Sequence, residues 1–212
     1  MESRKLLKNG KPRGKLTKKD ITKMSVLSFL EQASFSFERM QAPGFTLSML
    51  PAAEKIFGDS KEDMAEFMTY NMEFINTEPH MATFLMGLIL SMEEHGEDRK
   101  LIEGIRNGLF GPFAGLGDAI FWFTVLPISA AICCSLAQDG SILGPLLYIG
   151  IWIVAAISRI WFGSFGYKLG VKAVSTISEG TKYITKAAGI LGVMVVGGRS
   201  EERRVGKECR SR

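Results

Sequence analysis

The first third of the chain carries apolar side chains at the spacing of amphipathic helices. Thr17 and Asp20 supply a hydroxyl cap and a first-turn acid, which together predict a helix start. One apolar face of that helix is formed by residues at steps of four, three and four: Val26, Leu30, Ala33 and Phe37. Pro43 and Gly44 then break the pattern. Ser60 and Asp63 begin a second helix, whose face carries Met64, Phe67, Met68 and Met72.

Two charge-free runs interrupt this region. The first covers residues 40–53 and the second residues 79–92, and both are shorter than the roughly 20 residues that cross a bilayer core. The first holds two prolines, so we expect a re-entrant or interfacial hairpin there. Pro79 disfavours helix at the residue before it. A polar loop is predicted at 93–100, followed by a short amphipathic helix over 101–109.

The second half contains two candidate membrane spans. After a glycine-rich stretch over 108–118, residues 119–137 and 140–158 are free of charged side chains. Residues 162–185 are mildly amphipathic, and 187–198 begin another apolar run. We therefore predict an all-α integral membrane protein with amphipathic N-terminal helices, re-entrant or broken helices and about two to three membrane spans.

The charge distribution changes how the basic total is interpreted. The net charge is +4, but residues 1–20 hold eight Lys/Arg against two acids, and residues 199–212 hold six against three. Basic ends around an acidic, apolar middle do not form the folded stripe of a nucleic-acid binder, so no nucleic-acid binding is expected. The N-terminal cluster indicates a cytoplasmic juxtamembrane segment, and a solvated tail without function is the alternative.

The last residues differ from everything before them. From Arg199 to Arg212 the chain has almost no apolar residues and no amphipathic period. This composition is typical of translated vector sequence, so we treat 199–212 as a non-native tail; a native basic tail that binds anionic lipid is the alternative. The expected organisation is a basic segment at 1–20, a C-terminally truncated membrane domain at 21–198, and this tail.

The templates of catalysis are missing from the sequence. The chain has no P-loop, no third glycine after Gly115 and Gly117, and no metal-ligand spacing for either histidine. Three polar interruptions between apolar pieces stand out instead: Glu38 to Gln41, Asn76 to Glu78, and Gly117-Asp118. Polar groups inside a membrane fold mark functional sites by default, and transporters place them at broken helices. Pairing of Glu38 with Arg39 and capping of helix ends are the structural alternatives.

Several of these segments resemble one protein family. The motifs run from about residue 15 to residue 198 and are similar in type and order to the IID subunit of mannose-family sugar phosphotransferase permeases. They are Lys15-Leu-Thr-Lys-Lys-Asp20, Phe37-Glu-Arg-Met-Gln-Ala-Pro-Gly-Phe45, Glu73-Phe-Ile-Asn-Thr-Glu-Pro79, Gly108-Leu-Phe-Gly-Pro-Phe-Ala-Gly-Leu-Gly-Asp118 through Phe121-Trp122, and Gly140-Ser-Ile-Leu-Gly-Pro-Leu-Leu147.

The resemblance implies a function. IID subunits pair with an integral IIC subunit in hetero-oligomers and carry a hexose or amino sugar across the bacterial inner membrane. The soluble IIA and IIB proteins transfer the phosphoryl group through their own histidines, so this chain is expected to hold no catalytic residue, no metal and no cofactor. The expected location is a multi-pass position in the inner membrane, with a cytoplasmic N-terminus. Gln41, Asn76, Glu78 and Asp118 are the predicted substrate-binding residues.

Departures from the family pattern qualify this prediction. Some relatives carry His or Gln where this chain has Glu78, and an aromatic or apolar residue where it has His80. A carboxylate at position 78 would alter hydroxyl contacts and hence the preferred sugar. Family chains also continue past residue 198. A scaffold or receptor subunit that never touches substrate is the alternative function.

Overall fold

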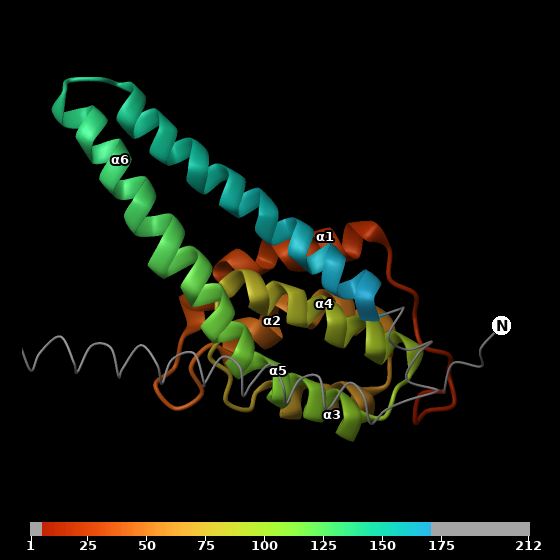
Figure 1. The fold of residues 1–212 in the computed structure, drawn as a ribbon. Coiled ribbons are helices and arrows are strands. Elements are labelled where there is room, and N and C mark those ends of the chain that lie inside the picture. Colours follow the sequence, from red (N-terminus) through yellow and green to blue (C-terminus); the bar gives the residue numbers. More distant parts are fainter. Residues whose placement is uncertain (1–5, 171–212) are drawn as a thin grey trace, which may run out of the picture.

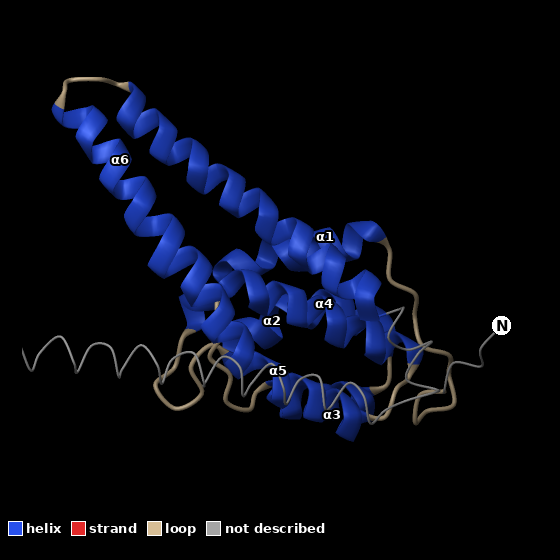
Figure 2. Ribbon diagram, viewed as in Figure 1, coloured by secondary structure: helices blue, strands red, loops and turns tan. Residues whose placement is uncertain are grey.

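The computed structural model of the protein describes residues 6–170. Regular secondary structure there is helical, with two isolated β-bridges, Ser36–Met40 and Met40–Ile75 (Figure 2). The segments predicted at 187–198 and 199–212 lie outside the described residues, as does most of 162–185. The all-α prediction is confirmed.

Nine helical segments follow one another in the described part of the chain. They are α1 (Lys18–Leu27), η1 (Ser28–Ser34), α2 (Ala42–Phe57), α3 (Lys61–Asn71), α4 (Pro79–His95), α5 (Arg99–Ile120), the π-helical η2 (Phe121–Val125), α6 (Leu126–Gln138) and a return helix (Leu143–Gly170).

The first helix begins as predicted but buries a different face. The backbone N–H of Thr17 donates to Asp20 at 2.6 Å, which closes the capping box. The inward side chains of α1 are Ile21, Met24 and Ser25, whereas the predicted apolar face is exposed: Val26 at 49%, Leu30 at 62% and Phe37 at 95%. The helix also tightens to a 3₁₀ turn after Leu27, so Phe37 lies beyond it. In a membrane protein an exposed apolar face meets lipid or a partner rather than water.

The region around Pro43 also differs from the prediction. Pro43 and Gly44 lie in the first turn of α2. Backbone N–H groups in a first turn have no partner inside the helix, so a proline, which lacks this group, is tolerated there. Residues 42–57 form one helix rather than a hairpin, and Pro51 lies inside it. Sixteen residues at 1.5 Å per residue give about 24 Å, which is short of a bilayer core.

The longest element was predicted in pieces. The polar loop is only three residues, 96–98, and α5, η2 and α6 run together from Arg99 to Gln138. The glycine-rich stretch at 108–118 does not break this helix, although each glycine costs roughly 1 kcal/mol of helix propensity. At Gly117 the reason is packing, because a Cβ there would clash with the side chain of Glu78.

Two helices are long and apolar enough to cross a membrane, Arg99–Gln138 and Leu143–Gly170. Figure 1 shows their far halves projecting as a hairpin from a bundle of the remaining helices. We call residues 121–158 the arm and the other described residues the base. Together the two helices account for the two spans expected from the charge-free segments.

The return helix packs into the base through small residues. A Cβ added at any of four glycines would collide with a neighbour, in three cases across the contact between the return helix and α4 and in one case against α1. The pairs are Gly87 with the Gly163 carbonyl, Gly163 with Ser25, Gly166 with the Phe84 carbonyl, and Gly170 with Ser91. Close backbone approach of this kind is how membrane helices associate. It fixes the return helix against α4.

Candidate functional site

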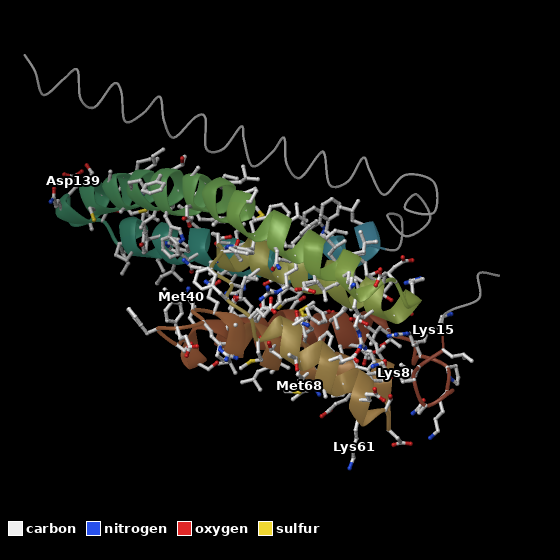
Figure 3. The ribbon with its side chains drawn as sticks, turned by 90° about the horizontal axis from the view of Figure 1, so that it is seen from below. Lys8, Lys15, Met40, Lys61, Met68 and Asp139 are labelled. Atoms are coloured by element: carbon white, nitrogen blue, oxygen red, sulfur yellow. The ribbon has the colours of Figure 1, made fainter. Side chains whose placement is uncertain are left out.

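The predicted polar segment around Asn76 lies where the base meets the arm. The Gln41 N–H donates to the carbonyl oxygen of Ile75 at 3.0 Å, beside the Met40–Ile75 bridge. Met40 takes a left-handed conformation, with φ of 52°, which turns the chain into α2. Figure 3 places Met40 between Asp139 at the arm tip and Lys8 and Lys15 at the opposite end. The segment therefore sits at an internal level of the fold.

Gln41 is buried and its amide is fully used. The side-chain Oε1 accepts from the N–H of Thr77 at 2.9 Å, and Nε2 donates to the Thr77 carbonyl at 2.8 Å. This pairing holds residues 75–77 alongside the start of α2. It leaves Asn76, whose side chain is exposed, as the amide that is presented outward.

Glu78 is buried and caps α4. Its Oε2 accepts from the N–H groups of His80 at 2.8 Å and Met81 at 3.2 Å, and its Oε1 lies 2.6 Å from His80 Nδ1. Its side chain also packs against Gly117, one residue before the half-buried Asp118 of α5. The capping alternative for Glu78 is thus seen directly. The structure brings all four predicted residues to one region, with Gln41 and Glu78 turned to backbone partners.

A second polar cluster lies beside the first, and the sequence analysis missed it. Arg159 of the return helix donates from Nε to Ser28 and Thr83, both at 3.1 Å, and from Nη2 to Glu31 at 3.0 Å. A further hydrogen bond joins its guanidinium to the Ser28 carbonyl. Glu31 is fully buried, and its other oxygen, Oε1, has no hydrogen-bond partner in the described structure.

Burial dominates the electrostatics of this cluster. Removal from water raises the pKa of Glu31 to about 8, although the Arg159 charge opposes the rise and the Glu78 charge adds to it. The two clusters therefore sense each other's charge. The sequence feature that could have predicted this cluster is Arg159 itself. It ends an apolar run, and a cation in that position needs an acidic or carbonyl partner.

A second buried cation, Arg106, fixes the loop that leads to Asn76. Arg106 is completely buried in α5 and donates from Nη2 to the carbonyl of Glu73 at 2.7 Å. The same nitrogen lies 3.4 Å from the carbonyl of Asn71 at the end of α3. A guanidinium that satisfies the free carbonyls of a helix end stabilises that end. Arg106 thus positions the start of the polar segment.

The opposite end of the base is closed by an ionic network. Glu93 is buried and accepts from Tyr70 at 3.0 Å and from Arg13 at 3.2 Å. Burial raises the pKa of Glu93, while Arg99 and Arg13 oppose that rise. Burial also raises the pKa of Tyr70 well above its usual value. This network fastens the N-terminal segment to α3 and α4, and it has the character of a structural clamp.

The chemistry available at the inner site is hydrogen bonding. Residues 6–170 contain no group of three His, Cys, Asp or Glu side chains that could hold a metal ion. Amides and carboxylates, by contrast, are donors and acceptors suited to hydroxyl groups. Such an arrangement can orient a polar solute.

Comparisons with known proteins agree on one family. A model described as "PTS system mannose/fructose/sorbose family IID component" matches residues 15–202. The mannose-specific EIID component of Escherichia coli (strain K12) is 38% identical over 190 residues, which cover 86% of this chain and 67% of that protein. The fructose permease IID component of Bacillus subtilis (strain 168) is 37% identical over 190 residues, with 86% and 69% covered.

A solved structure gives the same result. A chain in the cryo-EM structure of the mannose transporter ManYZ with microcin E492 (MceA) is 39% identical and superposes with a TM-score of 0.82. The match covers 87% of this chain and 70% of that chain. The likeness therefore extends to the arrangement of helices.

Proposed function

The chain belongs to the mannose/fructose/sorbose phosphotransferase IID component family, and on that premise we propose that its polar segment at residues 75–78 forms part of a sugar path shared with a IIC subunit. As a IID component the protein is a membrane subunit of a multi-subunit sugar permease. The proposed substrate is a hexose or an amino sugar. Its phosphorylation is assigned to soluble IIA and IIB proteins, and no catalytic residue to this chain.

One observation carries the site proposal. An exposed amide, Asn76, lies on a segment that is tied to its surroundings at three points: Gln41 pairs with Thr77, Arg106 donates to the Glu73 carbonyl just before the segment, and Glu78 at its end caps α4. A preorganised polar group binds a hydroxyl with little loss of conformational freedom. Asn76 and Asp118 are therefore proposed to contact sugar, whereas Gln41 and Glu78 are proposed to act near the path mainly by holding the segment.

An uptake assay tests the assignment. The chain is expressed with a IIC subunit of a mannose-type permease in a bacterial strain that lacks its own mannose permease, and uptake of labelled hexose is measured. We expect Asn76→Ala or Asp118→Ala to abolish uptake while membrane insertion persists. Gln32→Ala is the matched control, because it removes an exposed amide from η1. Normal uptake in both test variants would overturn the site.

Substrate contact is separated from scaffolding by chemical protection. Cys133, Cys134 and Cys209 are replaced by serine, and a single cysteine is placed at Asn76. Sugar that lies against this position slows its alkylation. An alkylation rate unaffected by saturating sugar would favour a scaffold subunit that never meets the substrate.

The proposed location is the bacterial inner membrane with the N-terminus in the cytoplasm. Support comes from Lys8, Lys15 and Lys61, which lie at the end of the molecule away from the arm tip (Figure 3). Lys/Arg-rich ends favour the cytoplasmic side. A cysteine at Lys15 should therefore resist an impermeant maleimide in intact cells and react after permeabilisation. Labelling in intact cells would reverse the orientation.

A further inference from the structure

Three lysines gather on the outer side of α1. Lys18, Lys19 and Lys23 are exposed, and within residues 6–170 their ammonium groups have no ion pair. The acid of this helix, Asp20, is already paired, because it accepts from the ammonium of Lys55 at 2.6 Å. The lysines therefore keep their positive charge, and such a surface attracts an anionic partner.

The same lysines border an apolar groove. An open groove of about 460 Å³ is lined by Lys18, Lys19, Thr22, Lys23, Val26 and Leu27. Lys19, Lys23 and Val26 share one face of the helix, because steps of four and three residues return to the same side. Beyond Val26, the exposed side chains of Phe29 and Leu30 extend the apolar surface. Charge at one end and hydrocarbon at the other suit an amphipathic ligand.

The return helix indicates where the membrane surface lies. It runs antiparallel to α1 (Figure 1), because Arg159 donates to Ser28 and, one turn later, Gly163 packs on Ser25. Trp161 lies between these two contacts and is exposed. Tryptophan is enriched where the hydrocarbon of a bilayer meets the headgroups. The end of α1 is therefore level with that boundary.

Both helices change from apolar to cationic in the same direction. On the return helix, the exposed Lys168 follows Trp161 by about 10 Å at 1.5 Å per residue. On α1, Lys19 precedes Val26 by the same distance of about 10 Å. The lysines of α1 therefore lie at the level of lipid headgroups, and its apolar end lies at the level of the acyl chains.

We propose that α1 binds an anionic glycerophospholipid, with the headgroup phosphate at Lys19 and Lys23 and an acyl chain over Val26, Leu27 and Leu30. The proposal goes beyond the sugar path and does not depend on it. Lysine pairs with a phosphate as a point charge, and basic clusters beside a membrane attract anionic lipids. A lipid fits better than a soluble anion, because the groove continues into apolar side chains.

A tryptophan placed in the groove reports the lipid that touches it. Replacement of Trp122, Trp152 and Trp161 by phenylalanine removes every tryptophan of the chain, and Val26→Trp then adds a single one. The full chain is reconstituted in mixtures of phosphatidylcholine and phosphatidylglycerol, one of which carries brominated acyl chains that quench tryptophan on contact. We expect phosphatidylglycerol to bind roughly tenfold more strongly than phosphatidylcholine. Equal binding of the two lipids would overturn the proposal.

A second reporter position is the matched control. Val154 is exposed on the arm, where the helix surface is apolar and holds no lysine. Val154→Trp in the same tryptophan-free chain should show no preference between the two lipids. A preference of the same size at both positions would mean that the lysines of α1 do not create it, which would overturn the site.

Charge variants test the two lysines directly. Lys19→Gln/Lys23→Gln should remove the preference measured at Val26→Trp. Lys61→Gln/Lys100→Gln removes the same charge from exposed lysines of α3 and α5 and should leave the preference unchanged. An equal loss in both double variants would show that net charge attracts the lipid, and the site would be wrong.

The last comparison separates a lipid from a free anion. At constant ionic strength, exchange of chloride for inorganic phosphate should leave the preference for phosphatidylglycerol unchanged. Loss of the preference in phosphate would mean an anion site that does not need a lipid, and would overturn the proposal. If the tryptophan-free chain fails to insert, electron paramagnetic resonance with spin-labelled forms of the two lipids measures the same preference in the chain with its own tryptophans. The same two double variants then decide the outcome.

Discussion

In the base, α4 buries sixteen of its seventeen residues, whereas in the arm only four of residues 121–158 are buried. Those four are Ser129, Cys133, Gly144 and Ala155. Both regions are apolar, but the base turns its apolar side chains onto one another and the arm turns them outward. The base can be folded by its own contacts. The arm needs lipid or a partner subunit to cover it.

Polar groups divide in the same way. Among the described residues, the base encloses two buried arginines, Arg106 and Arg159, each with hydrogen-bond partners. The arm has no Asp, Glu, Lys or Arg except Asp139 at its tip. Buried polar networks demand complete pairing, while an apolar surface tolerates small changes of shape. The two regions should therefore respond to substitution in opposite ways.

The largest effect is expected when the Arg159 cluster is broken. Arg159→Met removes the donor to the Glu31 carboxyl and leaves that group buried without a partner, which should cost about 3–5 kcal/mol of unfolding free energy, whereas Ser28 and Thr83 keep their hydrogen bond to each other. Thermal unfolding in detergent measures it. The double variant Glu31→Leu/Arg159→Met should recover part of the loss, since it removes both polar partners. If the double variant recovered no stability, the loss in Arg159→Met would not come from leaving Glu31 without a partner.

A charge placed on the arm should cost nearly as much, but at another step. Ile149 is 55% exposed near the middle of the arm, so Ile149→Lys should lower membrane insertion by roughly 2.5–3.5 kcal/mol, the cost of a lysine at the bilayer centre. Thr69→Lys is the control, because Thr69 is exposed on α3 at the charged end of the base. Glycosylation-mapped insertion compares the two. Equal insertion would show that the arm does not lie in lipid.

Short sequence motifs predicted local structure correctly, but they did not predict contacts between residues far apart in the chain. Thr17 and Asp20 form the capping box that their spacing predicts, and Glu78 caps α4 as one alternative proposed. Arg159 and Glu31 are 128 residues apart, and no periodicity links them. The site shows the same division. The polar segment was found because it interrupts apolar runs, whereas its support Arg106 acts through tertiary contacts.

Helix continuity is the other instructive failure. Glycine and proline density at 108–118 predicts a break by propensity, but the structure runs one helix through it. Tertiary packing overrides propensity when a glycine admits a neighbour, as Gly117 admits Glu78. The prediction of the buried face of α1 was wrong for a related reason. In a membrane protein the apolar face of a helix need not be the buried one.

Paired glycine substitutions sharpen the contrast at moderate cost. Gly166→Ala would push a Cβ into the carbonyl of Phe84 and should destabilise the base by about 1–3 kcal/mol. Gly150→Ala on the arm meets open space and should stabilise its helix by up to about 1 kcal/mol. The test compares the melting temperatures of the two variants, measured by thermal unfolding in the same detergent. Destabilisation of similar size at both positions would mean that the arm is packed in the way the base is.

Glu31→Gln should have the smallest effect on the melting temperature. The difference from the unsubstituted chain should be small at acidic pH and should grow as the pH rises. The pKa of Glu31 is raised from 4.5 to about 8 in the folded protein, so the folded state binds its proton more tightly than the unfolded state does. The stability that this provides is complete below about pH 4.5 and is lost as pH rises toward 8. The amide of glutamine does not titrate, so the melting temperature of Glu31→Gln should fall less than that of the unsubstituted chain between pH 5 and pH 8. The control lies at the tip of the arm. Asp139 is far from Glu31, so Asp139→Asn should leave the pH dependence of the melting temperature unchanged.

The contradicting outcome is a melting temperature that falls equally with pH in Glu31→Gln and in the unsubstituted chain. That result would mean that Arg159 keeps Glu31 ionised, and that the base holds an ion pair rather than a buried neutral acid.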